Sequence, residues 1–371
     1  MNPRSPAFMP RTGYISARWP YKTGALVPFS GPNQAKPRSL WIDCYLIVKA
    51  FYLCGVKKIL KRICHLKVRT GPEMRTETLN EIREFLISGG FDIFEYTRGC
   101  FDIAAKRDRL FLLKILTNVG SFQRGQARDL KLLSSFLDSS CFLLGERTRR
   151  ERLKESVVYE RFGVPVMTPD TFTSVIDGDY PEKFRTRGGT FGELDPSELR
   201  RYRKMNDMTQ SELAEELGIS QKSVSEHESG KKRALFDIVK AFEELLDEDI
   251  RKGINPFDIE PEVEDRRKGN KICRRLVDMG FRTGSVQRAP SKLLAKSDRT
   301  VLSRVVKREE DKKELDSLAN FSRISEAEAF IITTGDENID IVPPINIEEL
   351  EDIDSSGELV KLIEEKKESV W

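Results

Sequence analysis

The chain has 371 residues, enough for two or three domains, and 33% of them are charged. Its 63 Lys and Arg residues almost balance 60 Asp and Glu residues, and the net charge of +3 excludes a histone-like protein that coats nucleic acid by bulk attraction. The six cysteines form no Cys-x-x-Cys pair and only two histidines are present, so we expect no metal, no other cofactor and a reducing cytoplasm as the location.

The first part of the chain, residues 1–73, differs in composition from the rest. Residues 1–39 are rich in Pro, Gly, Ser and Arg and nearly free of acidic residues, which predicts disorder. Residues 40–56 are apolar, but this stretch is too short and too charged to span a membrane and too far from the start for a signal peptide. A capped amphipathic helix begins at Met74, so we interpret Met74 as the biological start and residues 1–73 as an extension.

From residue 74 to residue 182, helical and strand patterns alternate, which predicts a small α/β module. The charged turn at 106–109 joins two strands as a hairpin, and the apolar run 110–116 predicts a central buried strand. The predicted elements lie at 77–88, 91–106, 110–116, 127–138, 141–144, 164–167 and 169–175.

Two basic segments lie within and after this module. Residues 145–161 carry Arg147, Arg149, Arg150, Arg152 and Lys154. A run of this kind predicts a solvated, flexible excursion, and phosphate contact is the alternative. Residues 185–189, with two Arg and two Gly, are predicted to be a basic linker that could lie along a nucleic-acid duplex.

Between Thr209 and Gly230 two short amphipathic helices are joined by a tight turn at Gly218. The first helix has a small apolar face at Leu213, Ala214 and Leu217, and glycine suits a left-handed turn residue. The second helix begins after a Ser cap and turns one Val inward, which leaves polar side chains on its outer face. Flanking helices are expected at 195–204 and 234–246, the first with solvated Arg200, Arg201, Arg203 and Lys204.

Residues 195–247 resemble a Cro/C1-type helix-turn-helix of the lambda-repressor-like, or XRE, family. The motifs are the Thr-Gln opening, the Leu-Ala pair, the Leu-Gly-Ile-Ser turn, the Gln-x-Ser-Val start of the second helix and the Glu-x-Gly-Lys exit. The resemblance implies that Gln210 bonds to phosphate, that Gln221, Lys222 and Glu226 face base edges and that Ser225 lies near the backbone. The predicted DNA-binding residues are Thr209, Gln210, Ser220, Gln221, Lys222, Ser223, Ser225, Glu226, Lys231 and Lys232.

Charge limits the strength of this interaction. Residues 195–233 contain eight basic and eight acidic residues, so attraction to phosphate must come from local clusters at 200–204 and 231–233. Glu226 also departs from the family, in which Arg, Gln or Lys commonly stands there. The sequence therefore predicts modest, salt-sensitive affinity, and a packing module or a protein-binding domain is the alternative.

The chain also contains an internal repeat. A shift of 190 residues places Ile82, Gly90, Phe91, Ala105, Lys106, Asp108, Arg109 and Leu112 on Ile272, Gly280, Phe281, Ala295, Lys296, Asp298, Arg299 and Leu302. Further along, residues 141–145 match 330–335 loosely and residues 163–167 match 341–345. We therefore expect a multidomain protein with an all-α helix-turn-helix domain at 190–250 between two related α/β modules at 74–182 and 265–371. The shared Lys106 and Asp108 indicate turn chemistry.

The order of elements in each copy resembles the restriction-endonuclease-like core of the PD-(D/E)xK nucleases and archaeal junction resolvases. That resemblance implies a Mg²⁺ site with Asp102, an acid at position 112 and Lys114, but position 112 is Leu112. The second copy has Lys292 and Arg304 at the equivalent positions. We predict degenerate modules without catalytic residues, and we interpret Asp102 and Lys114 as ordinary hairpin residues that could pair with each other.

From Met74 onward the chain resembles an archaeal family of helix-turn-helix (HTH)-type transcriptional regulatory proteins. The resemblance implies a cytoplasmic transcriptional regulator, not an enzyme, that reads double-stranded DNA through the major groove with helix 220–229. The alternatives are an adaptor that bridges to the basal transcription machinery and a nuclease or DNA-repair factor. Two chains could form a homodimer through the α/β modules, or the two modules of one chain could pair across a pseudo-twofold axis. No membrane partner is expected, and a small-molecule effector stays open.

Overall fold

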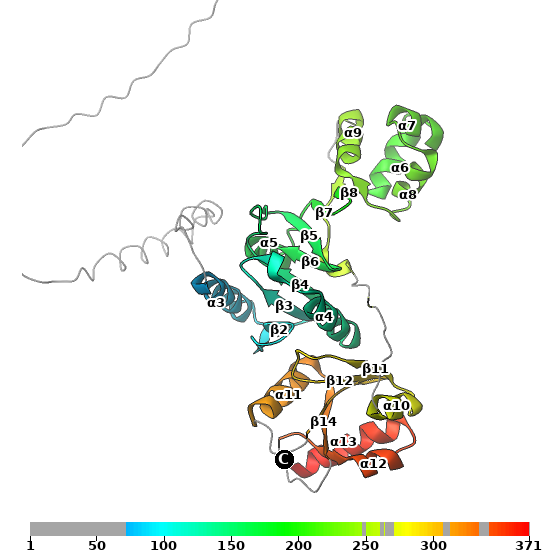
Figure 1. Ribbon diagram of the computed structural model, residues 1–371. Helices are drawn as coiled ribbons and strands as arrows, with labels where there is room; N and C mark the ends of the chain where they lie inside the picture. The colour runs from blue at the N-terminus through cyan, green and yellow to red at the C-terminus, as the bar shows by residue number, and fades with distance from the viewer. Residues whose placement is uncertain are drawn as a thin grey trace, which may run out of the picture. The chain divides into compact units, whose positions relative to one another are not determined.

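The computed structural model describes residues 72–246, 250–259, 263, 271–306, 312–333 and 341–370 (Figure 1). Every described residue falls in one compact unit, 69–371. The expectations for residues 1–71, including disorder and an extension before Met74, lie outside the described residues. No helix within the described ranges is long and apolar enough to cross a membrane.

The first sheet has ten strands and runs from the amino-terminal α/β region into the helix-turn-helix region. The strand order is β1–β2–β3–β4–β6–β5–β7–β8–β10, and β9 pairs with β8. The β3–β4 and β4–β6 pairs are parallel, as expected for strands joined by crossover connections. The strands are β1 (Asp92–Glu95), β2 (Ile103–Lys106), β3 (Leu110–Ile115), β4 (Ser140–Leu144), β5 (Val157–Arg161), β6 (Val164–Met167), β7 (Lys183–Thr186), β8 (Gly189–Leu194), β9 (Ala234–Leu235) and β10 (Arg251–Lys252).

Helices cover both faces of the first half of this sheet. Strand β3 is buried along its whole length because alternate residues pack into two separate cores. Phe111, Leu113 and Ile115 join one core with residues of α3 and α5, whereas Leu110 and Leu112 join another with residues of α4. The prediction of a central buried strand at 110–116 is confirmed. The helices are α3 (Pro72–Ser88), α4 (Arg124–Phe136) and α5 (Pro169–Ile176), and a short 3-10 helix, η1 (Val119–Ser121), precedes α4.

Three predictions for this region are wrong. The single strand expected at 91–106 is two strands, β1 and β2, that pair with each other. The charged run 145–161, whose five basic side chains are exposed as predicted, is not a loose excursion, because the backbone N–H of Leu153 bonds to Glu146 O at 2.8 Å, Leu153 is buried and the run ends in β5. The expected linker 185–189 forms the turn between the paired strands β7 and β8.

The second sheet has five strands in the order β11–β12–β13–β14–β15. The β13–β14 and β14–β15 pairs are parallel. The strands are β11 (Arg282–Ser285), β12 (Leu293–Lys296), β13 (Thr300–Val305), β14 (Glu328–Thr333) and β15 (Pro344–Asn346). The helices are α10 (Lys271–Asp278), α11 (Lys312–Ser325), α12 (Ile347–Asp352) and α13 (Ser356–Val370).

The hairpins of the two sheets have the same register, displaced by 190 residues. Asp92 pairs with Lys106 in the first sheet, and Arg282 pairs with Lys296 in the second. Beyond helices α4 and α11 the two copies are displaced by 188 residues instead of 190. Leu112 pairs with Cys141 in the first sheet, and its equivalent Leu302 pairs with Ala329 in the second. The loose match of residue 141 to residue 330 was therefore wrong by one position. The match of 163–167 to 341–345 agrees with the pairing of β6 and β15.

One hydrophobic core contains residues from both α/β regions. Phe321 of α11 stacks on Phe101 with ring centroids 5.1 Å apart and lies 5.8 Å from Phe94. Ion pairs at the edge of this contact are mirrored: Lys106 Nζ lies 2.5 Å from Glu326, and Lys296 pairs with Asp138. The interpretation of Lys106 as a residue shared for turn chemistry is therefore wrong, because its ammonium group joins the two regions.

The helix-turn-helix region consists of four helices around a small core of its own. Gly218 has a φ of +63°, the left-handed conformation predicted for the turn. The helix expected at 234–246 begins two residues later, because Ala234 and Leu235 form β9. The helices are α6 (Pro196–Met205), α7 (Gln210–Glu216), α8 (Gln221–Glu228) and α9 (Phe236–Leu246).

Candidate nucleic-acid interface

Helix α7 is fixed at its start by reciprocal hydrogen bonds. The backbone N–H of Glu212 donates to Thr209 Oγ1 at 3.2 Å, and the backbone N–H of Thr209 donates to Glu212 Oε2 at 2.7 Å. These bonds satisfy two N–H groups that would otherwise lack partners at a helix start. The bond from the Thr209 N–H, together with one from the Thr209 hydroxyl at 2.8 Å, lowers the pKa of the Glu212 carboxyl group. The Thr209 hydroxyl, predicted as a DNA contact, is thus engaged in capping.

Helix α8 presents a polar outer face and an apolar inner face. Ser220 caps the helix, and its hydroxyl accepts a hydrogen bond from Ser223 N at 3.1 Å. Val224 is fully buried, whereas Gln221, Lys222 and Ser225 are exposed; the Lys222 side chain is 84% exposed. Ser220 and Ser223 therefore stabilise the helix start, and Gln221, Lys222 and Ser225 form its accessible edge.

Glu226 lies beside this edge but already faces two cations. Its carboxylate oxygens are 3.9 Å from Lys222 Nζ and 3.4 Å from Lys232 Nζ. The Glu226 side chain is 30% exposed, and neutralisation by two lysines reduces the repulsion that a free carboxylate would exert on phosphate. Sequence reasoning did not foresee this pairing, because Lys232 lies beyond the end of α8.

A buried polar cluster lies on the inner side of α8. The Glu228 carboxylate accepts hydrogen bonds from Arg203 at 2.6 and 3.2 Å and from Gln210 Nε2 at 2.8 Å. Burial alone raises the pKa of Glu228, but these hydrogen bonds outweigh burial and lower it. The prediction that Arg203 is solvated is wrong, since its side chain is 17% exposed and binds α6 to α8. One N–H of the Gln210 amide remains available after this bond.

His227 packs between α8 and α9. It is buried, its ring meets the Phe242 ring edge to face at 6.4 Å, and its Nδ1 lies 3.1 Å from the backbone oxygen of Lys232. Burial lowers the pKa of His227, so the neutral ring is favoured. This contact fixes the chain that leaves α8 toward Lys231 and Lys232, which are both exposed.

The second candidate site, at Asp102 and Lys114, is closed. Asp102 is fully buried, and its carboxylate accepts hydrogen bonds from Arg75 at 2.7 Å, Lys114 Nζ at 3.0 Å and the backbone N–H of Ile115 at 2.8 Å. The side chain of Leu112 lies in the hydrophobic core. These residues do not fit a Mg²⁺ ion, which needs several open oxygen ligands. Within the described ranges, no group of three or more His, Cys, Asp or Glu residues could hold a metal ion.

The equivalent positions of the second α/β region carry two cations. Lys292 Nζ donates to the backbone oxygens of Gln287 and Ala289 at 2.5 and 3.3 Å, and Arg304 pairs with Glu314 at 2.7 Å. Burial, together with the neighbouring charge of Arg304, lowers the pKa of Lys292. The first copy therefore has an acid and a Lys at these positions and the second has two cations, as the sequence indicates. In both copies these charged side chains have hydrogen-bond partners.

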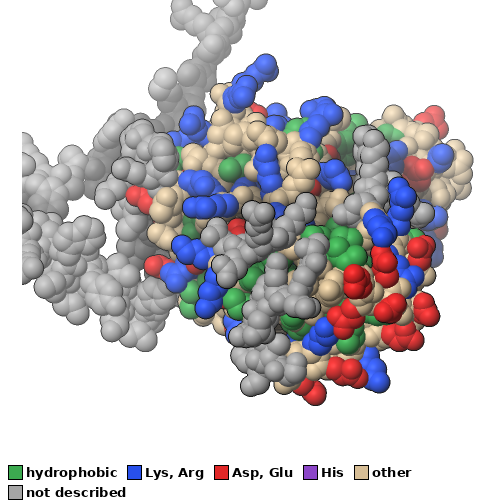
Figure 2. All heavy atoms as spheres, turned by 60° about the horizontal axis from the view of Figure 1, so that its bottom comes forward, with side chains coloured by type: hydrophobic (Ala, Val, Ile, Leu, Met, Phe, Trp, Pro, Cys, Tyr) green, Lys and Arg blue, Asp and Glu red, His purple; other side chains and the backbone are tan. Residues whose placement is uncertain are grey.

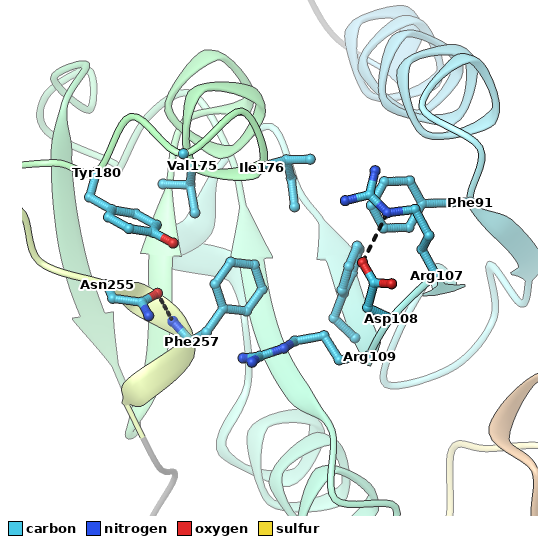
Figure 3. Close-up of a pocket in the computed structure, with 11 residues that line it drawn as sticks. Phe91, Arg107, Asp108, Arg109, Val175, Ile176, Tyr180, Asn255 and Phe257 are labelled. Carbon is cyan, nitrogen blue, oxygen red and sulfur yellow. Dashed lines mark hydrogen bonds and ion pairs between the residues drawn. The ribbon is translucent and has the colours of Figure 1, made fainter.

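A cavity of about 230 Å³ lies where the chain enters and leaves the helix-turn-helix region (Figure 3). Its walls include Tyr180, before β7, and Phe257, after β10. The Phe257 ring packs on Phe142 at 5.2 Å, and the Arg109 guanidinium lies over it at 5.4 Å. The backbone N–H of Phe257 donates to the side chain of Asn255 at 3.1 Å. The packing of the Phe257 ring on Phe142 and under Arg109 thus holds the returning segment against the first sheet.

Comparison with known families supports this division of the chain. Residues 75–181 match the model of a PD-(D/E)XK superfamily domain, and residues 199–252 match a helix-turn-helix model. The fold and the α7–α8 site thus define a helix-turn-helix protein of the Cro/C1 type that also carries a PD-(D/E)XK domain.

Curated relatives match most of the chain. A protein of Methanothermobacter thermautotrophicus, provisionally named an HTH-type transcriptional regulatory protein, is 34% identical over 308 residues, which cover 79% of this chain and 97% of the relative. A protein of Methanocaldococcus jannaschii with the same kind of name is 30% identical over 307 residues, which cover 78% and 96%. The chain belongs to this archaeal family of HTH-type transcriptional regulatory proteins. No solved structure matches it.

Proposed function

We propose that this protein is a sequence-specific DNA-binding transcriptional regulator and that α8 reads the major groove. The observation that supports the proposal is the exposed edge formed by Gln221, Lys222 and Ser225, three adjacent polar side chains on a helix whose other face is sealed by Val224 and the Glu228 cluster. A helix inserted into the major groove meets base edges with such side chains.

Each side chain of the interface has a proposed role. Gln221 suits adenine, with which its amide forms two hydrogen bonds, and Lys222 suits guanine. Ser225, Lys231, Lys232 and the remaining N–H of Gln210 contact the phosphate backbone. Glu226 holds Lys222 and Lys232 in place and makes no contact with a base. Thr209, Ser220 and Ser223 act through the helix starts that their hydroxyls stabilise.

The test begins with selection of a binding site from random duplexes by the full-length protein. We expect Gln221→Ala combined with Lys222→Ala to weaken binding to the selected site at least about 30-fold, because each base contact contributes about 1–3 kcal/mol of discrimination. Lys240→Ala removes a similar charge from α9 and serves as the control. Selection of no sequence, or equal binding by the double variant, would contradict the proposal.

We further propose that one chain carries one recognition helix between two related α/β modules. The shared register of the two hairpins and the common core around Phe321 support this arrangement over pairing of two chains through the same surfaces. We therefore expect a chain that does not dimerise through these modules and a site without twofold symmetry. Light scattering at micromolar concentration and the symmetry of the selected site test both expectations.

We propose that the PD-(D/E)XK domain is a scaffold and not a nuclease. The Asp102 carboxylate, whose two oxygens accept three hydrogen bonds from within the protein, and the apolar Leu112 support this role. The match to a PD-(D/E)XK model favours nuclease activity as the second candidate function. Incubation of the full-length protein with labelled duplex and branched DNA in Mg²⁺ separates them: cleavage that is lost in Asp102→Asn, in a variant that circular dichroism shows to be folded, would establish the nuclease.

A further inference from the structure

The net charge of +3 conceals an uneven distribution of charge over the molecule. Figure 2 shows Asp and Glu side chains gathered toward one end of the drawn face, with Lys and Arg side chains predominating elsewhere. An uneven distribution creates local positive potential that the net charge does not reveal. Clusters of arginine that lack carboxylate partners are therefore candidate binding surfaces for anions.

Four segments far apart in sequence bring such a cluster together on the first α/β region. Gly120 of η1 receives a hydrogen bond from Arg161 through its oxygen at 2.9 Å, and the aliphatic part of Arg149 packs on the same glycine. Arg161 and Arg124, the first residue of α4, both lie over the ring of Phe162, at 4.6 and 5.5 Å. The Phe162 ring thus holds two guanidinium groups at the turn between β5 and β6.

Arg187, in the turn between β7 and β8, lies beside Arg161, because Tyr159 of β5 pairs in parallel with Arg185 and Arg161 and Arg187 each follow two residues later. It completes this arginine surface, which we define as Arg124, Arg149, Arg161 and Arg187. Burial, together with the positive charges of Arg187 and Arg149, lowers the pKa of Arg161, which shows that these guanidinium groups repel each other. An anion placed among them would relieve the repulsion.

The nearby carboxylates are directed to other groups. Glu160 accepts a hydrogen bond from the backbone N–H of Gly163 at 3.3 Å, and Glu151 lies 3.7 Å from Arg185. Among the described residues, no carboxylate lies within 4 Å of a guanidinium nitrogen of Arg124, Arg149 or Arg187. The surface is therefore a group of exposed, unneutralised cations around one partly buried arginine.

We propose that this arginine surface binds the sugar–phosphate backbone of duplex DNA, outside the base pairs that α8 reads. The proposal rests on the proposed function, because both surfaces contact one duplex. Arg187 provides the link: it stands in the β7–β8 hairpin, and β8 also pairs with β9 and β10 of the helix-turn-helix region. The additional contact compensates for a helix-turn-helix segment, residues 195–233, whose own basic and acidic residues balance.

The test uses full-length protein and two duplexes of equal length, one with the selected site and one of mixed sequence. Binding is measured by fluorescence anisotropy over a range of salt concentrations. Log affinity falls with log salt, and each lost phosphate contact makes this slope shallower by about 0.9. Arg149→Ala combined with Arg187→Ala should therefore make the slope shallower by about 2 on both duplexes. Affinity should fall by the same factor on both, which leaves sequence preference unchanged.

Matched controls separate the two proposals. Arg274→Ala with Lys361→Ala removes the same charge from the second α/β region and should leave the slope unchanged, whereas Gln221→Ala with Lys222→Ala should abolish sequence preference. If the variant of Arg149 and Arg187 has the same slope as the wild type, and the wild type prefers the selected site, the proposal for the arginine surface is wrong and the proposed function stands. If selection yields no site, the proposed function fails, and the slope on mixed-sequence DNA still tests the surface. Absence of binding to any duplex overturns both.

Discussion

Two polar clusters of this protein differ in whether their side chains already have partners. In the PD-(D/E)XK domain, Asp102 is fully buried and accepts hydrogen bonds from Arg75, Lys114 and a backbone N–H. On α8, Gln221 and Lys222 are exposed and lie beside a carboxylate that is shared between two lysines. Similar residue types thus serve structure in one place and are available to a ligand in the other.

The match of residues 75–181 to a PD-(D/E)XK model therefore does not by itself establish a metal site. Metal-dependent hydrolysis needs oxygen atoms that are free to bind an ion, whereas both carboxylate oxygens of Asp102 already accept hydrogen bonds from other groups. Recognition of DNA needs donors and acceptors that a base can reach, and the exposed side chains of Gln221 and Lys222 are accessible although Lys222 lies 3.9 Å from Glu226. The following predictions test the contrast in order of expected effect.

The largest effect is expected for Asp102→Ala. Removal of the Asp102 carboxylate leaves the Lys114 ammonium group in the core without a counter-charge, since the Lys114 side chain is only 4% exposed. The free energy of unfolding, measured by urea denaturation, should therefore fall by about 3–5 kcal/mol. Glu314→Ala in the second α/β region is the comparison: Glu314 is 35% exposed, and its loss should cost about 1 kcal/mol. Equal losses at the two positions would refute the claim that only the first cluster is sealed.

An intermediate effect is expected for Glu228→Gln, which keeps the shape of the side chain and removes its charge. Loss of the charge-assisted hydrogen bonds from Arg203 should destabilise the protein by about 2 kcal/mol at neutral pH. The pKa of Glu228 is lowered by folding, so its contribution is fully present above the ordinary carboxyl pKa and is lost as pH falls through the lowered pKa. The stability of Glu228→Gln should therefore lack this part of the loss at acid pH. If the wild type and the variant lose stability in parallel as pH falls, Glu228 is not the group responsible.

A smaller, pH-dependent effect is expected for His227. Its pKa is lowered by burial, so the unfolded chain takes up a proton at a higher pH than the folded chain. The contribution of the neutral ring is present above the ordinary His pKa of about 6.5 and declines as pH falls below that value. Thermal unfolding of the wild type and of His227→Gln between pH 7.5 and about 5.5 measures the difference. An identical pH dependence in the two proteins would mean that His227 is not the titrating group.

Sequence reasoning recovered the elements whose signals are local. The Gly218 turn, the Ser220 cap and the apolar run of β3 are each encoded within a few neighbouring residues, and all are present. Strands β5, β7 and β8 were missed because they are short, carry charged residues and exist only through pairing with one another and with β6.

The candidate site shows the same limit. The exposed edge of α8 follows from helical periodicity, so Gln221, Lys222 and Ser225 could be placed from the sequence. The partners of Glu228 could not, because Arg203 lies 25 residues away on another helix. The interpretation of Lys106 was wrong for the same reason. Its partner Glu326 belongs to the second α/β module, and no pattern within the first module indicates this contact.

The smallest effect is expected for the two ion pairs between the α/β modules, and it tests whether the modules are related by pseudo-symmetry or resemble each other by chance. Lys106 pairs with Glu326 and Lys296 pairs with Asp138, and the lysines are similarly exposed, at 21% and 22%. Because both acidic partners are largely exposed, each pair should contribute less than about 1 kcal/mol to the free energy of unfolding. Equivalent positions predict equal coupling energies from two double-mutant cycles, Lys106→Ala with Glu326→Ala and Lys296→Ala with Asp138→Ala. A coupling confined to one cycle would mean that the mirrored contacts are not energetically equivalent and that a single ion pair joins the modules.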